Sequence, residues 1–206
     1  MRPTEDSARD GLTIGADGWC EQARHCPSPN FESRPADAVV DLLVVHNISL
    51  PPDEFGHHYI EDLFLNRLDC SAHPYFERLR ELKVSAHFLI RRDGELLQFV
   101  SASDRAWHAG VSRFRQRERC NDFSIGVELE GSDLRAFEDV QYEVLARLIR
   151  ALARRYPLQN VTGHEQIAPG RKTDPGPFFD WQRLARMLPA FSELPAPAQD
   201  GLQKSP

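Results

Sequence analysis

The alternation of apolar and polar positions predicts two buried strands. Residues 42–45, LLVV, form a continuous apolar run that is typical of a strand buried on both faces. Residues 123–130, FSIGVELE, alternate instead, and the four residues that share the apolar face are Phe123, Ile125, Val127 and Leu129. Glu128 therefore points away from that face, between small neighbours.

Helical spacing appears in four other segments. Apolar residues recur at intervals of three and four within 57–68 and again within 75–82, which predicts two short helices. Residues 138–156 predict the longest helix, because an apolar stripe runs between an acidic start and a basic end. A last helix is expected after Asp180, a suitable N-cap, and would bury Trp181, Leu184, Leu188 and Phe191.

A hairpin completes the pattern and decides the fold class. Residues 87–92 and 95–100 flank Asp93-Gly94, a strong turn signal because glycine accepts positive φ freely. Strands interleaved with helices, together with a hairpin, predict an α/β fold: a single domain with a central mixed sheet flanked by helices.

Length and composition set the boundaries of this domain. The 206 residues suit one domain, whereas residues 1–15 are polar and the tail is rich in proline with few apolar groups. We therefore expect a flexible N-terminal extension over 1–15, a folded domain over 16–191 and a flexible tail over 192–206.

Charge and cysteine content exclude several classes. A net charge of −6 argues against a nucleic-acid partner, and no apolar stretch approaches the ~20 residues of a membrane span. The N-terminus also lacks the apolar segment of a secretory signal, so a cytoplasmic location is expected. The four cysteines form no CxxC pair, and free thiols are expected for Cys20, Cys26, Cys70 and Cys120.

The histidines raise the question of a metal site, which spacing alone does not answer. HEQIA at 164–168 begins like a zinc-protease helix, but its fifth residue is Ala168 and nearby glycine and proline disfavour a helix, so we reject that interpretation. His46 at a strand end, His164 after Gly163 and Asp174 in a loop each have an ordinary structural explanation in isolation.

The segment 163–177, GHEQIAPGRKTDPGP, closely resembles the zinc-site loop of type 2 N-acetylmuramoyl-L-alanine amidases. Four further segments resemble the AmpD-type branch of that family, the cytoplasmic 1,6-anhydro-N-acetylmuramyl-L-alanine amidases. They are LLVVHNISLPP (42–52), VSAHFLIRRDGELLQFV (84–100), RAWHAG (105–110) and RERCNDFSIGVELEG (117–131). With PSP at 27–29, the resemblance covers roughly residues 18 to 185.

The resemblance implies a zinc ion at one edge of the sheet, held by His46, His164 and Asp174. It assigns Glu128 as the general base and Lys172 as the group that stabilises the oxyanion. The residues in matching segments that are reasonable substrate contacts are Asn47, Trp107, His108, Arg119 and Arg171. At Lys83, where relatives carry arginine, a point charge would replace a bidentate fork, which leaves carboxylate contact there open.

The implied activity is hydrolysis of the amide between 1,6-anhydro-N-acetylmuramic acid and L-alanine in cytosolic muropeptides during cell-wall recycling. The implied substrate is an anhydro-muropeptide, and no membrane and no obligate protein partner are inferred. Two alternatives stay open: an envelope amidase acting on intact peptidoglycan, and a peptidoglycan-recognition module that binds without cleaving. A cysteine or serine hydrolase is weaker, because the sequence contains no nucleophile elbow.

Overall fold

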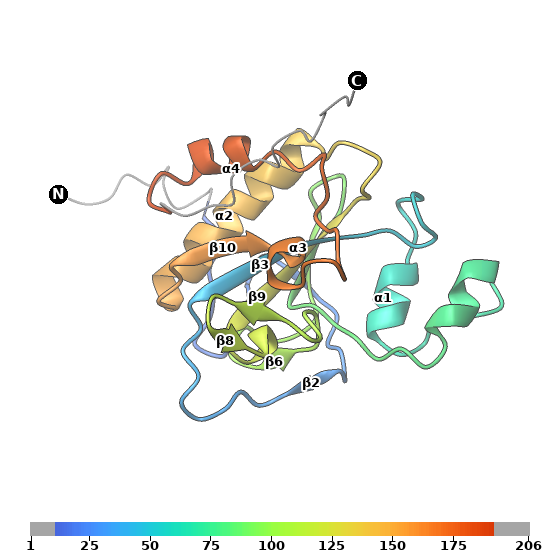
Figure 1. The fold of residues 1–206 in the computed structure, drawn as a ribbon, viewed down its shortest axis with the longest axis horizontal. Coiled ribbons are helices and arrows are strands. Elements are labelled where there is room, and N and C mark those ends of the chain that lie inside the picture. Colours follow the sequence, from blue (N-terminus) through green and yellow to red (C-terminus); the bar gives the residue numbers. More distant parts are fainter. Residues whose placement is uncertain (1–10, 192–206) are drawn as a thin grey trace, which may run out of the picture.

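A six-stranded mixed sheet forms the centre of the molecule, as the sequence predicts (Figure 1). The computed structural model describes residues 11–191. The strand order is β1-β5-β4-β9-β3-β10, in which β5 is antiparallel to β4 and the other pairs are parallel. The strands are β1 (Arg24–His25), β3 (Leu42–Ile48), β4 (Phe88–Ile90), β5 (Leu96–Gln98), β9 (Ser124–Glu130) and β10 (Asn160–Gly163).

Two helices cover one face of this sheet. Helix α2 (Asp139–Arg155) begins with a capping box in which Glu138 and Gln141 bond to each other's backbone, and it ends just before Pro157. Helix α4 (Trp181–Met187) begins at Asp180, whose side chain accepts from the backbone N–H of Arg183. Both helices lie together on one side of the sheet (Figure 1), where they pack on the apolar face of β9. Both predicted helices are thereby confirmed.

Shorter elements cover the opposite face and leave room there for the site. They are α1 (Tyr59–Phe64), the 3-10 helices η1 (Pro74–Leu79) and η2 (Cys120–Asp122), and the paired strands β2 (Phe31–Glu32) with β6 (Arg105–Ala106) and β7 (Arg113–Phe114) with β8 (Arg117–Glu118). Every residue of β9 is buried, so its polar face points into the protein and not to solvent.

Three local predictions need correction. Helix α1 is only six residues long, and the second predicted helix is the 3-10 helix η1, which begins at Pro74 after His73 caps it. Strand β10 was not predicted, because only Val161 and Thr162 of its four residues, NVTG, favour a strand, which is too short a run to give a pattern. A single turn of helix, α3 (His164–Ile167), forms where glycine and proline disfavoured one, although Ala168 still excludes the zinc-protease pattern.

The hairpin turn between β4 and β5 contains Gly94. Gly94 has φ of +88°, and a Cβ there would lie 2.6 Å from Val140 Cγ2, so the turn and the close approach both require glycine.

Residues 11–15 pack on the domain, since Leu12 is buried and Ile14 pairs with Cys20, which differs from the expected boundary at residue 16. Residues 1–10 of the expected flexible extension 1–15, and the expected flexible tail 192–206, lie outside the described residues.

The described part of the chain contains no helix with the length and apolar character that crossing a bilayer requires.

Candidate metal and active site

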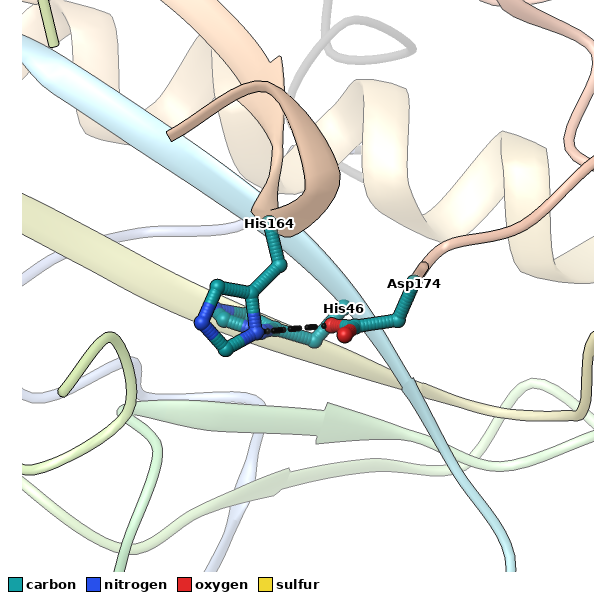
Figure 2. Close-up of side chains that lie close together, drawn as sticks. All are labelled: His46, His164 and Asp174. Atoms are coloured by element: carbon teal, nitrogen blue, oxygen red, sulfur yellow. Dashed lines mark hydrogen bonds and ion pairs between the residues drawn. The ribbon is translucent and has the colours of Figure 1, made fainter. Parts of the chain in front are cut away.

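Three side chains converge on one point at the C-terminal ends of β3 and β10. His46 Nδ1, His164 Nδ1 and Asp174 Oδ2 are 3.0 Å apart in each of the three pairs (Figure 2). Ligands placed 2.0–2.1 Å from a tetrahedral metal ion would be about 3.3 Å apart, so the observed spacing is close to that of a metal site. The two rings and the carboxylate point toward one another (Figure 2), which suits three ligands of a single ion.

Strand pairing brings the two histidines together, although 118 residues separate them in the sequence. Gly163 of β10 is in register with Val45 of β3, so His46 and His164 both follow directly after paired residues. A Cβ at Gly163 would lie 2.6 Å from Pro175 Cδ and 3.2 Å from the Trp181 ring. Glycine at this position therefore allows the loop that carries Asp174 to approach β10 closely.

Backbone hydrogen bonds fold that loop back onto the site. The backbone carbonyl of Asp174 accepts from the N–H of Glu165 at 2.9 Å, which ties the end of the loop to the first turn of α3. The N–H groups of Arg171 and Lys172 both donate to the Ala168 carbonyl at 3.1 Å. The position of the carboxylate is thus fixed by main-chain contacts as well as by the two histidines.

The protonation states of the site suit a divalent cation. Burial lowers the pKa of His46 to about 4, against an opposing hydrogen bond to Asp174. Burial raises the pKa of Asp174, but hydrogen bonds to His164 and His46 outweigh it and hold that pKa well below its ordinary value. At neutral pH, His46 is therefore neutral and Asp174 ionised, which are the forms in which these groups bind metals.

Glu128 lies beside this cluster as a buried carboxyl group with one oxygen that has no hydrogen-bond partner. It is in register with His46 on the neighbouring strand, and its Oε2 has no hydrogen-bond partner within residues 11–191. Burial, reinforced by the negative charge of Asp174, raises the pKa of Glu128 well above its ordinary value, while Lys172 opposes the shift. A buried carboxyl group with a raised pKa is suited to exchange protons near neutral pH.

A cavity of about 550 Å³ opens over these groups. Its polar side carries all five residues predicted for metal binding and catalysis: His46, Glu128, His164, Lys172 and Asp174. The opposite wall is largely apolar and includes Leu63, Phe64, Tyr75, Leu79, Val84 and Trp107. Only Trp107 of this wall is predicted from the sequence as a substrate contact, because the other residues come from α1, η1 and a loop whose packing is not visible in the sequence.

The residues predicted to contact substrate are divided between two places. Asn47, Trp107, His108 and Arg171 line the cavity, whereas Arg119 does not. Arg119 pairs with Asp122 and lines a neighbouring cavity of about 500 Å³, which shares Arg171 with the first. Substrate contact stays a prediction for all five.

Three of the four predicted residues that line the cavity form side-chain hydrogen bonds to other groups of the protein. Asn47 donates to Asp133 Oδ1 at 2.7 Å, and Arg171 Nη2 donates to the carbonyls of Ala109 and Val111. His108 Nδ1 lies 3.0 Å from His46 Nε2, a contact that the sequence analysis missed. Lys83 lies apart from all of them, in a small cavity of about 170 Å³ between α1 and η1.

The fold and the site together define an α/β protein with a buried His-His-Asp cluster able to hold a divalent metal. Comparison of the sequence with known families agrees with this class, because residues 36–177 match the N-acetylmuramoyl-L-alanine amidase family. This match spans most of the chain and includes all three residues of the cluster. The chain belongs to the N-acetylmuramoyl-L-alanine amidase family.

Individual relatives refine the comparison. The chain is 57% identical to the 1,6-anhydro-N-acetylmuramyl-L-alanine amidase AmpD of Citrobacter freundii, over 84% of this chain and 93% of that protein. A crystal structure of an AmpD selenomethionine derivative superposes with a TM-score of 0.81 at 57% identity, covering 83% of this chain and 97% of that one.

A more distant solved structure contains a substrate. The amidase AmiD of Escherichia coli, in complex with anhydro-N-acetylmuramic acid-L-Ala-D-γ-Glu-L-Lys, has a TM-score of 0.54 and 29% identity. The similarity covers 86% of this chain and 65% of that one. It extends the likeness of the fold to a family member that holds an anhydro-muropeptide.

Proposed function

We propose that this protein is a zinc-dependent, cytoplasmic amidase that cleaves the amide bond between the lactyl group of 1,6-anhydro-N-acetylmuramic acid and L-alanine during cell-wall recycling. The observation that carries the proposal is the convergence of the three ligand atoms beside the unpartnered carboxyl of Glu128, in one cavity. The high identity to AmpD over most of both chains supports the choice of substrate.

His46, His164 and Asp174 would hold the zinc ion, and Glu128 and Lys172 would act on the reacting atoms. When bound, the zinc supplies a Lewis acid that polarises the scissile carbonyl and acidifies water. Glu128 takes a proton from the water as its oxygen attacks the carbonyl carbon, and then gives that proton to the leaving amide nitrogen as the C–N bond breaks. Lys172 Nζ stabilises the negative charge that develops on the carbonyl oxygen.

The two walls of the cavity suit the two parts of an anhydro-muropeptide. Trp107 offers an aromatic surface against which a sugar ring can pack, beside the apolar residues of α1 and η1. Arg171 and Lys172 line the same cavity and supply positive charge for the carboxylates of a stem peptide.

Metal analysis combined with mass spectrometry tests the proposal. The purified protein should contain one zinc ion per chain and should split an anhydro-muropeptide into free peptide and free anhydro-sugar. Bound but uncleaved muropeptide would support a recognition module instead. Release of peptide from intact peptidoglycan, with no cleavage of the soluble fragment, would support an envelope amidase.

A further inference from the structure

The outer ring nitrogen of His46 is hydrogen-bonded to a second imidazole. His46 Nε2 lies 3.0 Å from His108 Nδ1, and His108 Nε2 lies 3.3 Å from Ser124 Oγ. All three side chains are buried. A neutral imidazole carries one N–H donor and one acceptor nitrogen. The donor and the acceptor in each hydrogen bond of this series therefore determine those in the next.

The last hydrogen bond of this series, from Ser124 to the Cys120 carbonyl, sets the direction of the others. The Cys120 carbonyl can only accept, so the Ser124 hydroxyl donates its hydrogen to it, at 2.6 Å. Ser124 Oγ is then an acceptor for His108 Nε2–H, which leaves His108 Nδ1 without a proton. His108 Nδ1 is therefore an acceptor for His46 Nε2–H, which leaves the electron pair of His46 Nδ1 for a metal ion in the cluster. Without the ion, the Asp174 carboxylate, 3.0 Å from His46 Nδ1, can only accept and competes for the same proton.

Ala109, the residue after His108, contacts the outer ring nitrogen of the second histidine, His164. His164 Nε2 lies 3.2 Å from the carbonyl oxygen of Ala109, which can only accept. His164 Nε2–H therefore donates to this carbonyl, which leaves the Nδ1 atom of His164 for a metal ion in the cluster. Two consecutive residues, His108 and Ala109, thus contact the outer nitrogens of both imidazoles.

The surroundings hold these two residues in place. Asn121 Oδ1 accepts from the backbone N–H groups of both His108 and Ala109, at 3.2 and 2.8 Å. Gly126 of β9 makes space for the His108 ring, because a Cβ at this position would lie 2.4 Å from His108 Cγ. Arg171 Nη2 also donates to the Ala109 carbonyl, which links this segment to the loop that carries Asp174.

We propose that His108 and the Ala109 carbonyl fix both histidines in the tautomer whose Nδ1 is free to bind metal, and that His108 is a positioning residue for His46. The inference rests on the proposed function, because it assigns His46 and His164 as ligands. Partners of this kind typically contribute 10- to 100-fold to metal affinity. The substrate contact that the resemblance implies for His108 stays a separate prediction.

Zinc affinity of a matched pair of variants tests the role of His108. Asparagine places its Oδ1 near the position of Nδ1, so His108→Asn keeps the acceptor, whereas His108→Leu removes it. Competition with a chelating indicator should give a zinc Kd about 10- to 100-fold weaker for His108→Leu. His108→Asn should remain close to the parent protein. Equal Kd values for the leucine variant and the parent would overturn the proposal.

A second variant and a direct observation keep the test independent of folding and of activity. Ser124→Ala removes the acceptor that orients His108 and should weaken zinc binding about tenfold, while Ser124→Thr retains the hydroxyl and should restore it. In the zinc-free proteins, nitrogen NMR of the imidazoles should find a larger share of the His46 proton on Nε2 in the parent than in His108→Leu, and equal shares would overturn the proposal. A parent that binds no zinc would instead refute the proposed function, while the NMR result would still decide the tautomer.

Discussion

His46 and Glu128 occupy the same register position on two neighbouring parallel strands, β3 and β9. Paired strands lie about 4.8 Å apart, and residues in register on adjacent parallel strands point to the same face. The proposed metal ligand and the proposed base are therefore placed relative to each other by main-chain hydrogen bonds in the middle of the sheet. A rigid relationship of this kind suits a proton transfer that depends on a short distance.

Glu128→Gln should lower kcat by about 10²- to 10⁴-fold, because glutamine keeps the shape of the side chain but cannot take up the proton. Zinc content should be unchanged, since Glu128 makes no hydrogen bond to the three ligands. Steady-state kinetics on an anhydro-muropeptide and metal analysis measure both. Glu165→Gln is the matched control, because Glu165 follows His164 but does not line the cavity. Near-parental turnover of Glu128→Gln would show that another group moves the proton.

The same substitution should stabilise the zinc-free protein at neutral pH. The pKa of Glu128 is raised in the folded state, mainly by burial, so the unfolded chain releases this proton at a lower pH. Below the ordinary value of 4.5 both states are protonated and glutamine offers no advantage. As the pH rises above that value, the parent loses stability relative to Glu128→Gln. Denaturant unfolding at about pH 4 and about pH 7 should show a gain only at the higher pH. An equal gain at both would exclude titration as the cause.

Lys172 should affect turnover and not metal content. Lys172→Met removes a cation from the cavity and should lower kcat by about 10²- to 10³-fold, the usual effect of losing one oxyanion donor. Lys172→Arg retains the charge and should lose less. Zinc analysis of both variants should match the parent, because Lys172 contributes no atom to the cluster. Loss of zinc from the methionine variant would mean that Lys172 supports the loop carrying Asp174.

The sequence predicts most of the central sheet and the two packing helices, because their apolar patterns are strong locally. Strands β3 and β9 and helix α2 all follow from spacing alone. Strand β10 does not, since only Val161 and Thr162 favour a strand and the pairing with β3 completes it. Without β10, nothing in the residues themselves indicates that His46 and His164 meet, and only the family resemblance supplied that contact.

For the site too, the resemblance selects residues, but the sequence does not give their positions. The resemblance selects His108 and Arg119 as substrate contacts, but one is hydrogen-bonded to His46 and the other lies outside the main cavity. Both placements depend on the path of residues 105–123, which contains only short strands and a 3-10 turn. Segments of this kind carry little periodicity, so their course is set by tertiary contacts that the sequence does not display.

Residues 11–15 should contribute to stability, whereas we expect residues 1–10 to be dispensable. Leu12 is buried against α2, and its carbonyl accepts from Arg154 Nη2 at 2.8 Å. Burying a leucine contributes about 1.5–3 kcal/mol, so deletion of 1–15 should lower Tm by roughly 3–12 °C relative to deletion of 1–10. Thermal unfolding of the two truncated proteins and the full chain measures the difference. Equal Tm values would restore the boundary at residue 16.

Arg91 should be the most sensitive ion-pair residue outside the site, because it lies between two buried carboxylates. It donates to Glu61 of α1 and to Glu130 at the end of β9, and all three side chains are at least nine-tenths buried. Arg91→Met would leave both carboxylates buried without their shared cation, which typically costs about 3–5 kcal/mol. Denaturant unfolding should detect that loss at neutral pH.

Arg24 provides the matched control, since it reaches the same Glu61 from a position in which its side chain is 48% exposed. An exposed partner is screened by solvent, so Arg24→Met should change stability by less than about 1 kcal/mol. Adding Glu61→Gln and Glu130→Gln to Arg91→Met should recover part of the loss, because the two buried charges that have lost Arg91 are then removed. Equal effects of Arg24→Met and Arg91→Met would show that burial does not set the strength of this network. Because α1 also supplies Leu63 and Phe64 to the cavity wall, Arg91→Met should raise KM for the muropeptide more than it lowers kcat.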